Sequence, residues 1–149
     1  MAVAGKYIEL YYHLVWATKN REPLISVDLE AKLYDHLRRS CVDMKVFLYA
    51  LNGMPDHVHV VCSVPPTLSI SATVKQLKGA SARLLNGEHT WFAWQPGYAA
   101  LTFAGRDLRM VQDYVDRQKQ HHGANTLHAR LEATPVASDR CAKDAEYVR

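Results

Sequence analysis

Two apolar runs joined by a short turn predict a β-hairpin near the middle of this chain. Residues 44–52 have the composition of one strand, and a second strand begins at His57-Val58-His59-Val60. Between them, Asn52-Gly53-Met54-Pro55-Asp56 is typical of a turn, so the two runs are expected to pair as an antiparallel hairpin. Because side chains alternate along a strand, the two histidines share one face and the two valines share the other.

The remaining periodicities predict a single α+β domain. Strands are expected over 7–18 and, interrupted by Pro96-Gly97, over 90–103; helices are expected from Ser26 to about Cys41, from Ser69 to Asn86 with Gly87 as cap, and from Arg106 to His122, closed by Gly123. The order predicts a ferredoxin-like antiparallel sheet with helices on one face, plus a C-terminal helix. Residues 1–133 form this domain, and residues 134–149, which lack periodicity, are expected to be a loosely ordered tail.

Composition excludes several classes of protein. The net charge of +3 over 149 residues permits a nucleic-acid partner without requiring one. The three cysteines, Cys41, Cys62 and Cys141, are odd in number and widely spaced, which argues against a disulfide framework or a zinc knuckle and favours a reducing cytoplasm. No apolar run reaches the roughly 20 residues that span a bilayer, and no signal pattern opens the chain, so no membrane role is expected.

The third predicted helix carries a tyrosine that could take part in chemistry. Tyr114 and Gln118 are four residues apart and therefore share a face, which Val111 places beside the apolar stripe. His121 follows on the same face. Each residue also has a plainer interpretation: Tyr114 as a packing residue, Gln118 as a solvated one, and His121-His122 as cations near a helix C-terminus.

Phosphodiester cleavage is a reaction in which these residues could act together. A phenol with a pKa near ~10 is a weak nucleophile at neutral pH, and a nearby cation would lower that pKa and polarise a phosphate. His57, His59 and the side-chain carbonyl of Gln118 offer three neutral ligands for a divalent ion such as Mg²⁺ or Mn²⁺, although zinc also suits imidazole. His13, His36, His89 and His128 have no partner that the sequence identifies and are taken as structural or exposed.

Several sequence blocks, in order, resemble the single-tyrosine HUH transposases of the smallest insertion sequences and their repeat-associated relatives. The resemblance covers residues 7 to 125. It comprises the blocks Tyr12-His13-Leu14-Val15-Trp16-Ala17-Thr18-Lys19-Asn20-Arg21, Asn52 to His59, Leu77-Lys78-Gly79, Trp94-Gln95-Pro96-Gly97-Tyr98, and Tyr114-Val115-Asp116-Arg117-Gln118 with His121-His122. The HUH motif, two histidines around a bulky hydrophobic residue, corresponds to His57-Val58-His59.

The resemblance implies a specific reaction. Members of the family are ferredoxin-like dimers that cut single-stranded DNA at hairpin-marked ends, and the tyrosine helix can complete the partner's active site. The tyrosine becomes linked to a 5′ phosphate, a 3′ hydroxyl is released, and a second transesterification rejoins strands. Carried over, Tyr114 is the nucleophile, and His57, His59 and Gln118 hold the metal. The tail from Thr134 matches nothing in this pattern.

Basic residues suggest where DNA would lie. Lys75, Lys78 and Arg83 lie on the second predicted helix, which has no acidic residue, and Lys19 and Arg21 follow the first strand. Such a face attracts phosphates, although it could equally be a solvated helix surface. Trp91, Phe92, Trp94 and Tyr98 could stack on unpaired bases, but at least half of them are expected in the core.

Three alternatives to a mobile-element transposase stay open. The same chemistry could serve a domesticated nuclease acting on dispersed palindromic repeats. A non-catalytic hairpin-binding protein could keep the fold alone, against which the intact Tyr114, His57, His59 and Gln118 argue. A structural zinc domain is disfavoured because no cysteine lies near the histidine pair.

Overall fold

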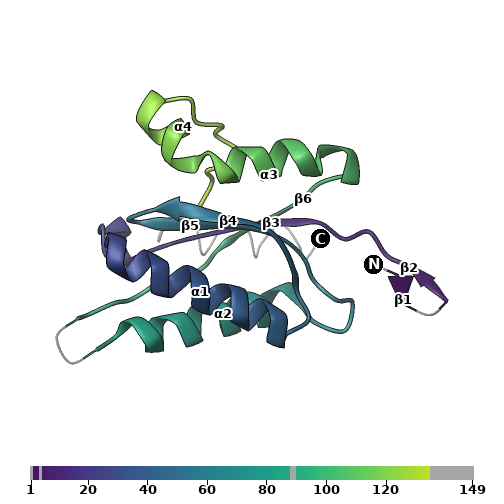
Figure 1. Ribbon diagram of the computed structural model, residues 1–149, viewed down its shortest axis with the longest axis horizontal. Helices are drawn as coiled ribbons and strands as arrows, with labels where there is room; N and C mark the ends of the chain where they lie inside the picture. The colour runs from purple at the N-terminus through teal and green to yellow at the C-terminus, as the bar shows by residue number, and fades with distance from the viewer. Residues whose placement is uncertain (1, 4, 88–89, 135–149) are drawn as a thin grey trace, which may run out of the picture.

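The computed structural model describes residues 2–3, 5–87 and 90–134. Within them, one antiparallel sheet has the strand order β4-β5-β3-β6, and the first two strands form a separate small sheet. The elements are β1 (Ala2–Val3), β2 (Lys6–Tyr7), β3 (Tyr12–Ala17), η1 (Lys19–Arg21), α1 (Val27–Asp43), β4 (Phe47–Met54), β5 (His57–Ser63), α2 (Ile70–Leu85), β6 (Ala99–Thr102), η2 (Gly105–Asp107), α3 (Leu108–Asp116) and α4 (Gln118–Ala124). Helices α1 and α2 cover one face of the larger sheet, and α3 and α4 lie on the other (Figure 1).

The predicted hairpin is confirmed and places the histidine pair at the start of a central strand. β4 and β5 pair in antiparallel register, with Gly53 opposite Val58 and Met54 opposite His57. Gly53 is required here by close approach, because a β-carbon at that position would lie 2.2 Å from the carbonyl oxygen of His57. The absence of a side chain at one residue of the hairpin therefore permits the pairing that positions His57.

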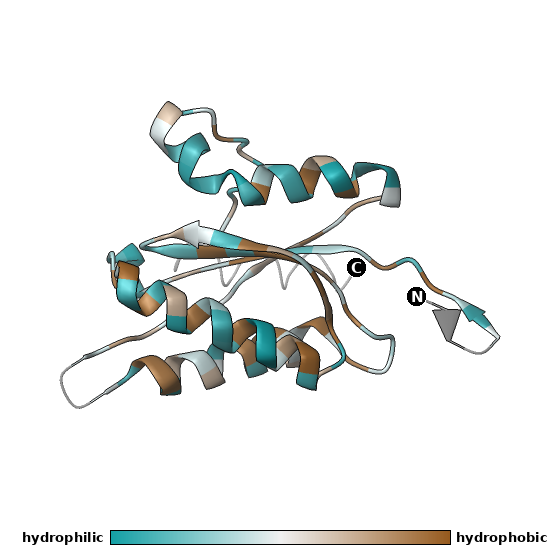
Figure 2. Ribbon diagram, in the orientation of Figure 1, coloured by the Kyte–Doolittle hydropathy of each residue, from teal (hydrophilic) through white to brown (hydrophobic). Residues whose placement is uncertain are grey.

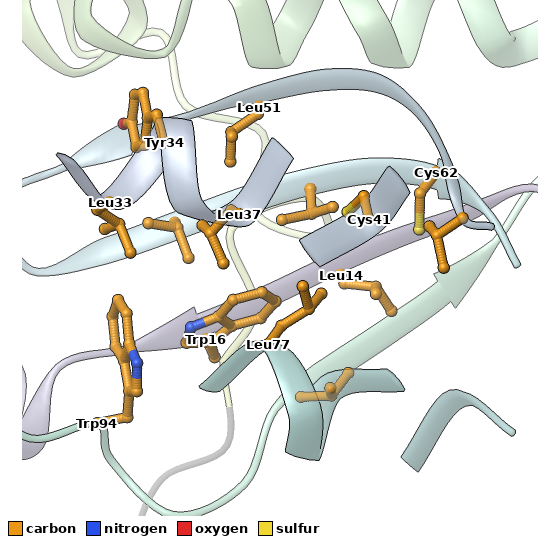
Figure 3. Close-up of a cluster of buried hydrophobic side chains, with 14 of the residues drawn as sticks. Leu14, Trp16, Leu33, Tyr34, Leu37, Cys41, Leu51, Cys62, Leu77 and Trp94 are labelled. Atoms are coloured by element: carbon orange, nitrogen blue, oxygen red, sulfur yellow. The ribbon is translucent and has the colours of Figure 1, made fainter. Parts of the chain in front are cut away.

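The main hydrophobic core lies between the sheet and the first two helices. Figure 3 shows Leu14 and Trp16 of β3 facing Leu33 and Leu37 of α1, with Leu77 of α2 alongside. Apolar colour runs along the strands and along α2, whereas α3 and α4 are mostly hydrophilic (Figure 2). Val58 and Val60 belong to this core, which confirms the predicted alternation along β5 and leaves the histidines on the opposite face.

Serine side chains cap both core helices, at the two residues where the sequence predicts that the helices start. The Ser26 hydroxyl accepts a hydrogen bond from the Leu29 amide, and the Ser69 hydroxyl accepts one from the Ala72 amide. These bonds satisfy amide groups that have no partner inside the helix. The end of α2 differs from expectation, because Asn86 rather than Gly87 is the C-cap.

Two predicted strands are shorter in the structure, for reasons that lie in their partners. The strand predicted over 7–18 pairs in the larger sheet only over Tyr12–Ala17, because its partner β5 ends at Ser63, just before Pro65-Pro66. A proline has no amide hydrogen to continue a ladder. The strand predicted over 90–103 is limited to Ala99–Thr102, and the residues before Pro96-Gly97 contribute an isolated bridge between Trp94 and Thr18.

The predicted third helix is divided. It breaks at Arg117, whose φ of −100° and ψ of 20° are not helical, and α4 then runs past Gly123 to Ala124. Asn125, in the left-handed region with φ of 54°, ends it in place of the predicted Gly123. At the break, Asn52 donates a side-chain hydrogen bond to the carbonyl of Asp116 at 3.0 Å. The end of β4 therefore also holds the junction that begins α4.

Lys119 fastens α4 to the rest of the domain. Its ammonium group donates to the Glu30 carboxylate of α1 at 2.8 Å and to the Asn52 side-chain oxygen at 2.9 Å.

Among the residues that the structure describes, no helix has both the length and the apolar character needed to cross a membrane. Of the predicted tail, all but Thr134 lies outside the described residues.

Candidate metal and tyrosine site

The two histidines of β5 face α3 and α4 from the sheet. Both side chains are buried, His57 at 1% and His59 at 0% exposure, and their ring centroids lie 5.0 Å apart. Their Nε2 atoms point toward the same carboxylate oxygen, Glu132 Oε2, at 3.4 Å and 3.3 Å. The rigid sheet thus presents two imidazole nitrogens to one point.

Glu132, in the segment that follows α4, lies at the centre of the cluster. One of its oxygens, Oε1, accepts hydrogen bonds from the Tyr114 hydroxyl at 2.6 Å and from the Gln118 amide at 2.7 Å. The other, Oε2, faces His57, His59 and, at 3.6 Å, His122 Nε2. A single carboxylate therefore bridges the tyrosine to the imidazoles.

The charge of this carboxylate is strongly favoured. Burial alone would raise the pKa of Glu132, but the contacts from His57, His59 and the Tyr114 hydroxyl outweigh it and hold the pKa well below its ordinary value. The pKa of His57 is raised because Asp56 and Glu132 together overcome burial, whereas burial keeps the pKa of His59 below its ordinary value. One anion therefore lies against two imidazoles that differ in their readiness to take a proton.

Tyr114 is packed between α4 and the segment after it. Its ring stacks on His121 with centroids 4.5 Å apart, and its hydroxyl accepts a hydrogen bond from the His128 backbone amide at 3.0 Å. Burial and the hydrogen bond to Glu132 raise the pKa of Tyr114 to about 12. The phenol is therefore protonated at neutral pH, and it would need a nearby cation to become a nucleophile.

The donor atoms fit a divalent ion. Within the described residues, His57 Nε2, His59 Nε2, His122 Nε2 and Gln118 Oε1 are buried without a well-directed hydrogen-bond partner. Ligand atoms of His57, His59 and Glu132 lie within 4.8 Å of one another. Buried polar atoms without partners are costly, and an ion coordinated by them removes that cost. The sequence predicted Gln118 as the third ligand, whereas the structure directs its amide nitrogen to Glu132 and brings Glu132 to the histidines.

His57 is held from its other side by charged groups. Asp56 Oδ1 lies 2.7 Å from His57 Nδ1, and Arg21 Nε lies 3.3 Å from Asp56 Oδ2. A carboxylate on Nδ1 favours the tautomer whose Nε2 is available to a metal. Arg21, predicted as a DNA contact, therefore lies beside the histidine pair.

The other predicted DNA contacts occupy different places. Lys75 and Arg83 are exposed and line one groove along α2, on the far side of the sheet from the histidines. Lys78 is half-buried, and its ammonium group donates to the carbonyls of Gln95 and Gly97 at 2.7 Å and 2.8 Å. Lys19 is exposed in η1. Arg21 alone of the five contacts a residue of the histidine pair.

Of the four aromatic residues considered for base stacking, two belong to the main core. Phe92 and Trp94 are buried there, and the Trp94 indole donates to the Ser81 hydroxyl at 3.0 Å. Tyr98 packs against the same core, while Trp91 remains 59% exposed. The expectation that at least half would be core residues is confirmed.

Sequence reasoning missed four residues around the site: His13, Asp56, His122 and Glu132. Asp56 had a usable signal, since it directly precedes the histidine pair in the turn. His122 lies four residues after Gln118, which is also helical spacing, but His121 was preferred because it lies seven after Tyr114. Glu132 had no local signal, because it reaches the site through the path of an irregular segment.

Comparison with known proteins gives the class. The profile of a family described as IS200-like transposases matches residues 6–118. The ISDra2 transposase TnpA of Deinococcus radiodurans is 33% identical over 122 residues, which cover 76% of this chain and 87% of the relative. The IS200 transposase of Salmonella typhimurium is 27% identical over 115 residues, covering 72% and 75%.

Solved structures agree in fold. A protein described as a transposase from Deinococcus radiodurans superposes with a TM-score of 0.61 at 34% identity, covering 79% of this chain and 98% of the other. A REP-associated tyrosine transposase bound to a REP hairpin superposes with a TM-score of 0.63, covering 95% and 96%; at 16% identity it supports the fold alone. Fold and sequence together define a transposase, an enzyme class that cleaves DNA. The chain belongs to the IS200-like family of transposases.

Proposed function

We propose that this chain cuts and rejoins single-stranded DNA at hairpin-marked ends through a 5′-phosphotyrosine intermediate on Tyr114. The observation that carries the proposal is that the Tyr114 hydroxyl and the Nε2 atoms of His57 and His59 converge on the two oxygens of one carboxylate. A phosphate bound at the same point would lie within reach of the phenol. Arg21, beside His57, supplies a further positive charge.

His57, His59 and Glu132 would hold a divalent ion, Mg²⁺ or Mn²⁺, with Gln118 or His122 completing the set. When bound, the ion supplies positive charge that polarises the phosphate and favours ionisation of the phenol. Imidazole nitrogens together with a carboxylate suit Mn²⁺ better than Mg²⁺, which prefers oxygen ligands.

The proposed cleavage involves one proton transfer from Tyr114 and the exchange of one bond to phosphorus for another. The hydrogen bond that the Tyr114 hydroxyl donates to Glu132 orients the phenol, and the Tyr114 proton passes to water as the phenol ionises. The phenolate oxygen forms a bond to phosphorus and the bond from phosphorus to the 3′ oxygen breaks. That oxygen takes a proton from water and leaves as a 3′ hydroxyl. Attack by a second 3′ hydroxyl reverses these changes, so no external energy source is needed. Stacking on His121 and the His128 amide hold the phenol in place.

The experiment uses labelled single-stranded oligonucleotides from the DNA flanking the gene, incubated with Mn²⁺ and resolved on a denaturing gel. Tyr114→Phe should abolish the covalent protein–DNA adduct and spare hairpin binding, because only the hydroxyl is removed. The control Tyr98→Phe removes a hydroxyl from a residue that packs against the main core, and it should leave adduct formation unchanged. A normal amount of adduct from Tyr114→Phe would refute the proposed nucleophile.

A homodimer is part of the proposal. In the described chain Tyr114 meets its own histidine pair through Glu132, so a complete site can form within one subunit. Mixing Tyr114→Phe with a His57→Ala/His59→Ala double variant tests whether subunits exchange the tyrosine helix. Restored cleavage requires sites shared between two subunits. Mixtures that never cut would indicate sites built within one chain.

A further inference from the structure

A histidine on the neighbouring strand contacts the metal-side histidine directly. His13 in β3 has no exposed surface, and its Nε2 lies 2.8 Å from His59 Nδ1. The two rings are nearly parallel, with centroids 5.0 Å apart and planes 10° apart. In the antiparallel register Val15 lies opposite His59 and His13 lies opposite Val61, so the two histidines are diagonal neighbours on one face.

The hydrogen bond between these rings constrains where their protons lie. His59 Nε2 faces Glu132 and the proposed ion, and a nitrogen that binds a metal cannot carry a hydrogen. The hydrogen of neutral His59 is then on Nδ1, which donates to Nε2 of His13. His13 in turn must carry its own hydrogen on Nδ1. Burial favours the neutral form of His13, whose Nδ1 is buried without a hydrogen-bond partner among the described residues.

We infer that His13 is a positioning residue that holds His59 in the tautomer and ring orientation needed to bind the divalent ion. The inference rests on the proposed metal site and adds a specific requirement to it. Ligand histidines generally donate their second nitrogen to an outer partner, and loss of that partner weakens metal binding. Asp56 is this partner for His57, at 2.7 Å, and the buried imidazole of His13 is the partner for His59.

The surroundings of His13 offer a test by chemical rescue. His13 borders a cavity of about 370 Å³ that lies between β6, α3 and the segment containing His128 and Arg130. Shortening His13 would extend this cavity toward His59. Added imidazole could then reach His59 Nδ1 and act as the missing acceptor. A histidine that only fills space in the core would not be replaced by a free imidazole in a metal-binding assay.

The first experiment titrates Mn²⁺ into the metal-free protein by calorimetry. His13→Leu, which has similar bulk but no acceptor, should weaken Mn²⁺ binding about 10- to 100-fold. His13→Gln, whose amide oxygen can accept the bond from His59, should lose much less, and imidazole should restore binding to His13→Ala. The control His36→Leu changes a histidine of α1, on the other face of the sheet, and should bind like the wild type.

The second experiment observes the tautomers directly. Long-range ¹H–¹⁵N spectra of the Zn²⁺-loaded protein should show hydrogen on Nδ1 of both His13 and His59. If the wild type binds neither Mn²⁺ nor Zn²⁺, the proposed metal site fails. If the wild type binds and His13→Leu binds equally well, or if His59 Nδ1 lacks hydrogen in the loaded protein, the role of His13 alone is overturned. If His13→Leu does not fold, the His13→Gln affinity, the imidazole rescue and the wild-type spectra decide.

Discussion

Gly53→Ala tests whether the hairpin sets the position of the histidine pair. The added β-carbon would lie 2.2 Å from the His57 carbonyl oxygen and 2.9 Å from Val58 Cα, and both of these atoms belong to the backbone of β5. Neither can move away without displacing the strand. Overpacking of this kind costs about 1–3 kcal/mol, and each lost ladder hydrogen bond costs about 1 kcal/mol. We therefore expect a loss of about 2–5 kcal/mol in the free energy of unfolding.

The measurement is urea unfolding followed by circular dichroism, with Mn²⁺ titration as a second readout. Mn²⁺ binding should weaken as well, because His57 moves with the displaced strand. Gly79→Ala is the matched control, since Gly79 is exposed within α2 and nothing lies within 4 Å of a β-carbon there. It should stabilise the protein by about 0.5–1 kcal/mol through helix propensity. A Gly53→Ala variant as stable as the wild type would refute the argument from close approach.

Three further changes give distinct results. In metal-free protein, Glu132→Gln should lower the free energy of unfolding most between pH 4.5 and 6.5. Because the pKa of Glu132 is lowered on folding, its contribution to stability is present above pH 4.5 and lost in acid; because the pKa of His57 is raised, its contribution is complete below pH 6.5 and lost as the pH rises further. A pH-independent effect in thermal unfolding would contradict this. Leu77→Ala, at 0% exposure, should cost about 2–5 kcal/mol in urea unfolding, and a smaller loss would show that α2 repacks. Lys78→Met should cost roughly 1–3 kcal/mol of stability, because two carbonyls lose their hydrogen-bond donor. Lys75→Met should instead reduce the salt dependence of single-strand binding by about one ion. Equal effects of the two variants on stability would contradict the different placements of the two lysines.

Local patterns predicted most of the fold. The hairpin connection, the helix starts at Ser26 and Ser69, and the alternation along β5 are each determined by neighbours in sequence, and the structure confirms them, although the turn itself is limited to Pro55-Asp56 because β4 continues to Met54. The ends of β3 and β6 were wrong because the length of a strand depends on its partner. The break at Arg117 was missed because Asn52, far away in sequence, holds the carbonyl just before it.

The candidate site was predicted only in part, because some of its residues are brought together by contacts between distant segments. His57, His59, Tyr114 and Gln118 were selected by spacing within single elements, and the structure brings all four around Glu132. Glu132 itself arrives on a segment without periodicity, which no pattern places. The contact of His13 with His59 depends on the register between two strands, and a shift by one residue would direct His13 to the other face.

The alternation along β5 places the side chains that build the large core and the histidine pair on opposite faces of the sheet. Val58 and Val60 support the large core beneath α1 and α2, while His57 and His59, on the opposite face, lie against Glu132. Substitutions on the histidine face can therefore change that cluster and leave the large core of the fold in place. A transposase of this family that lost the histidine pair would therefore keep the sheet and its two covering helices, because neither histidine belongs to the core between them.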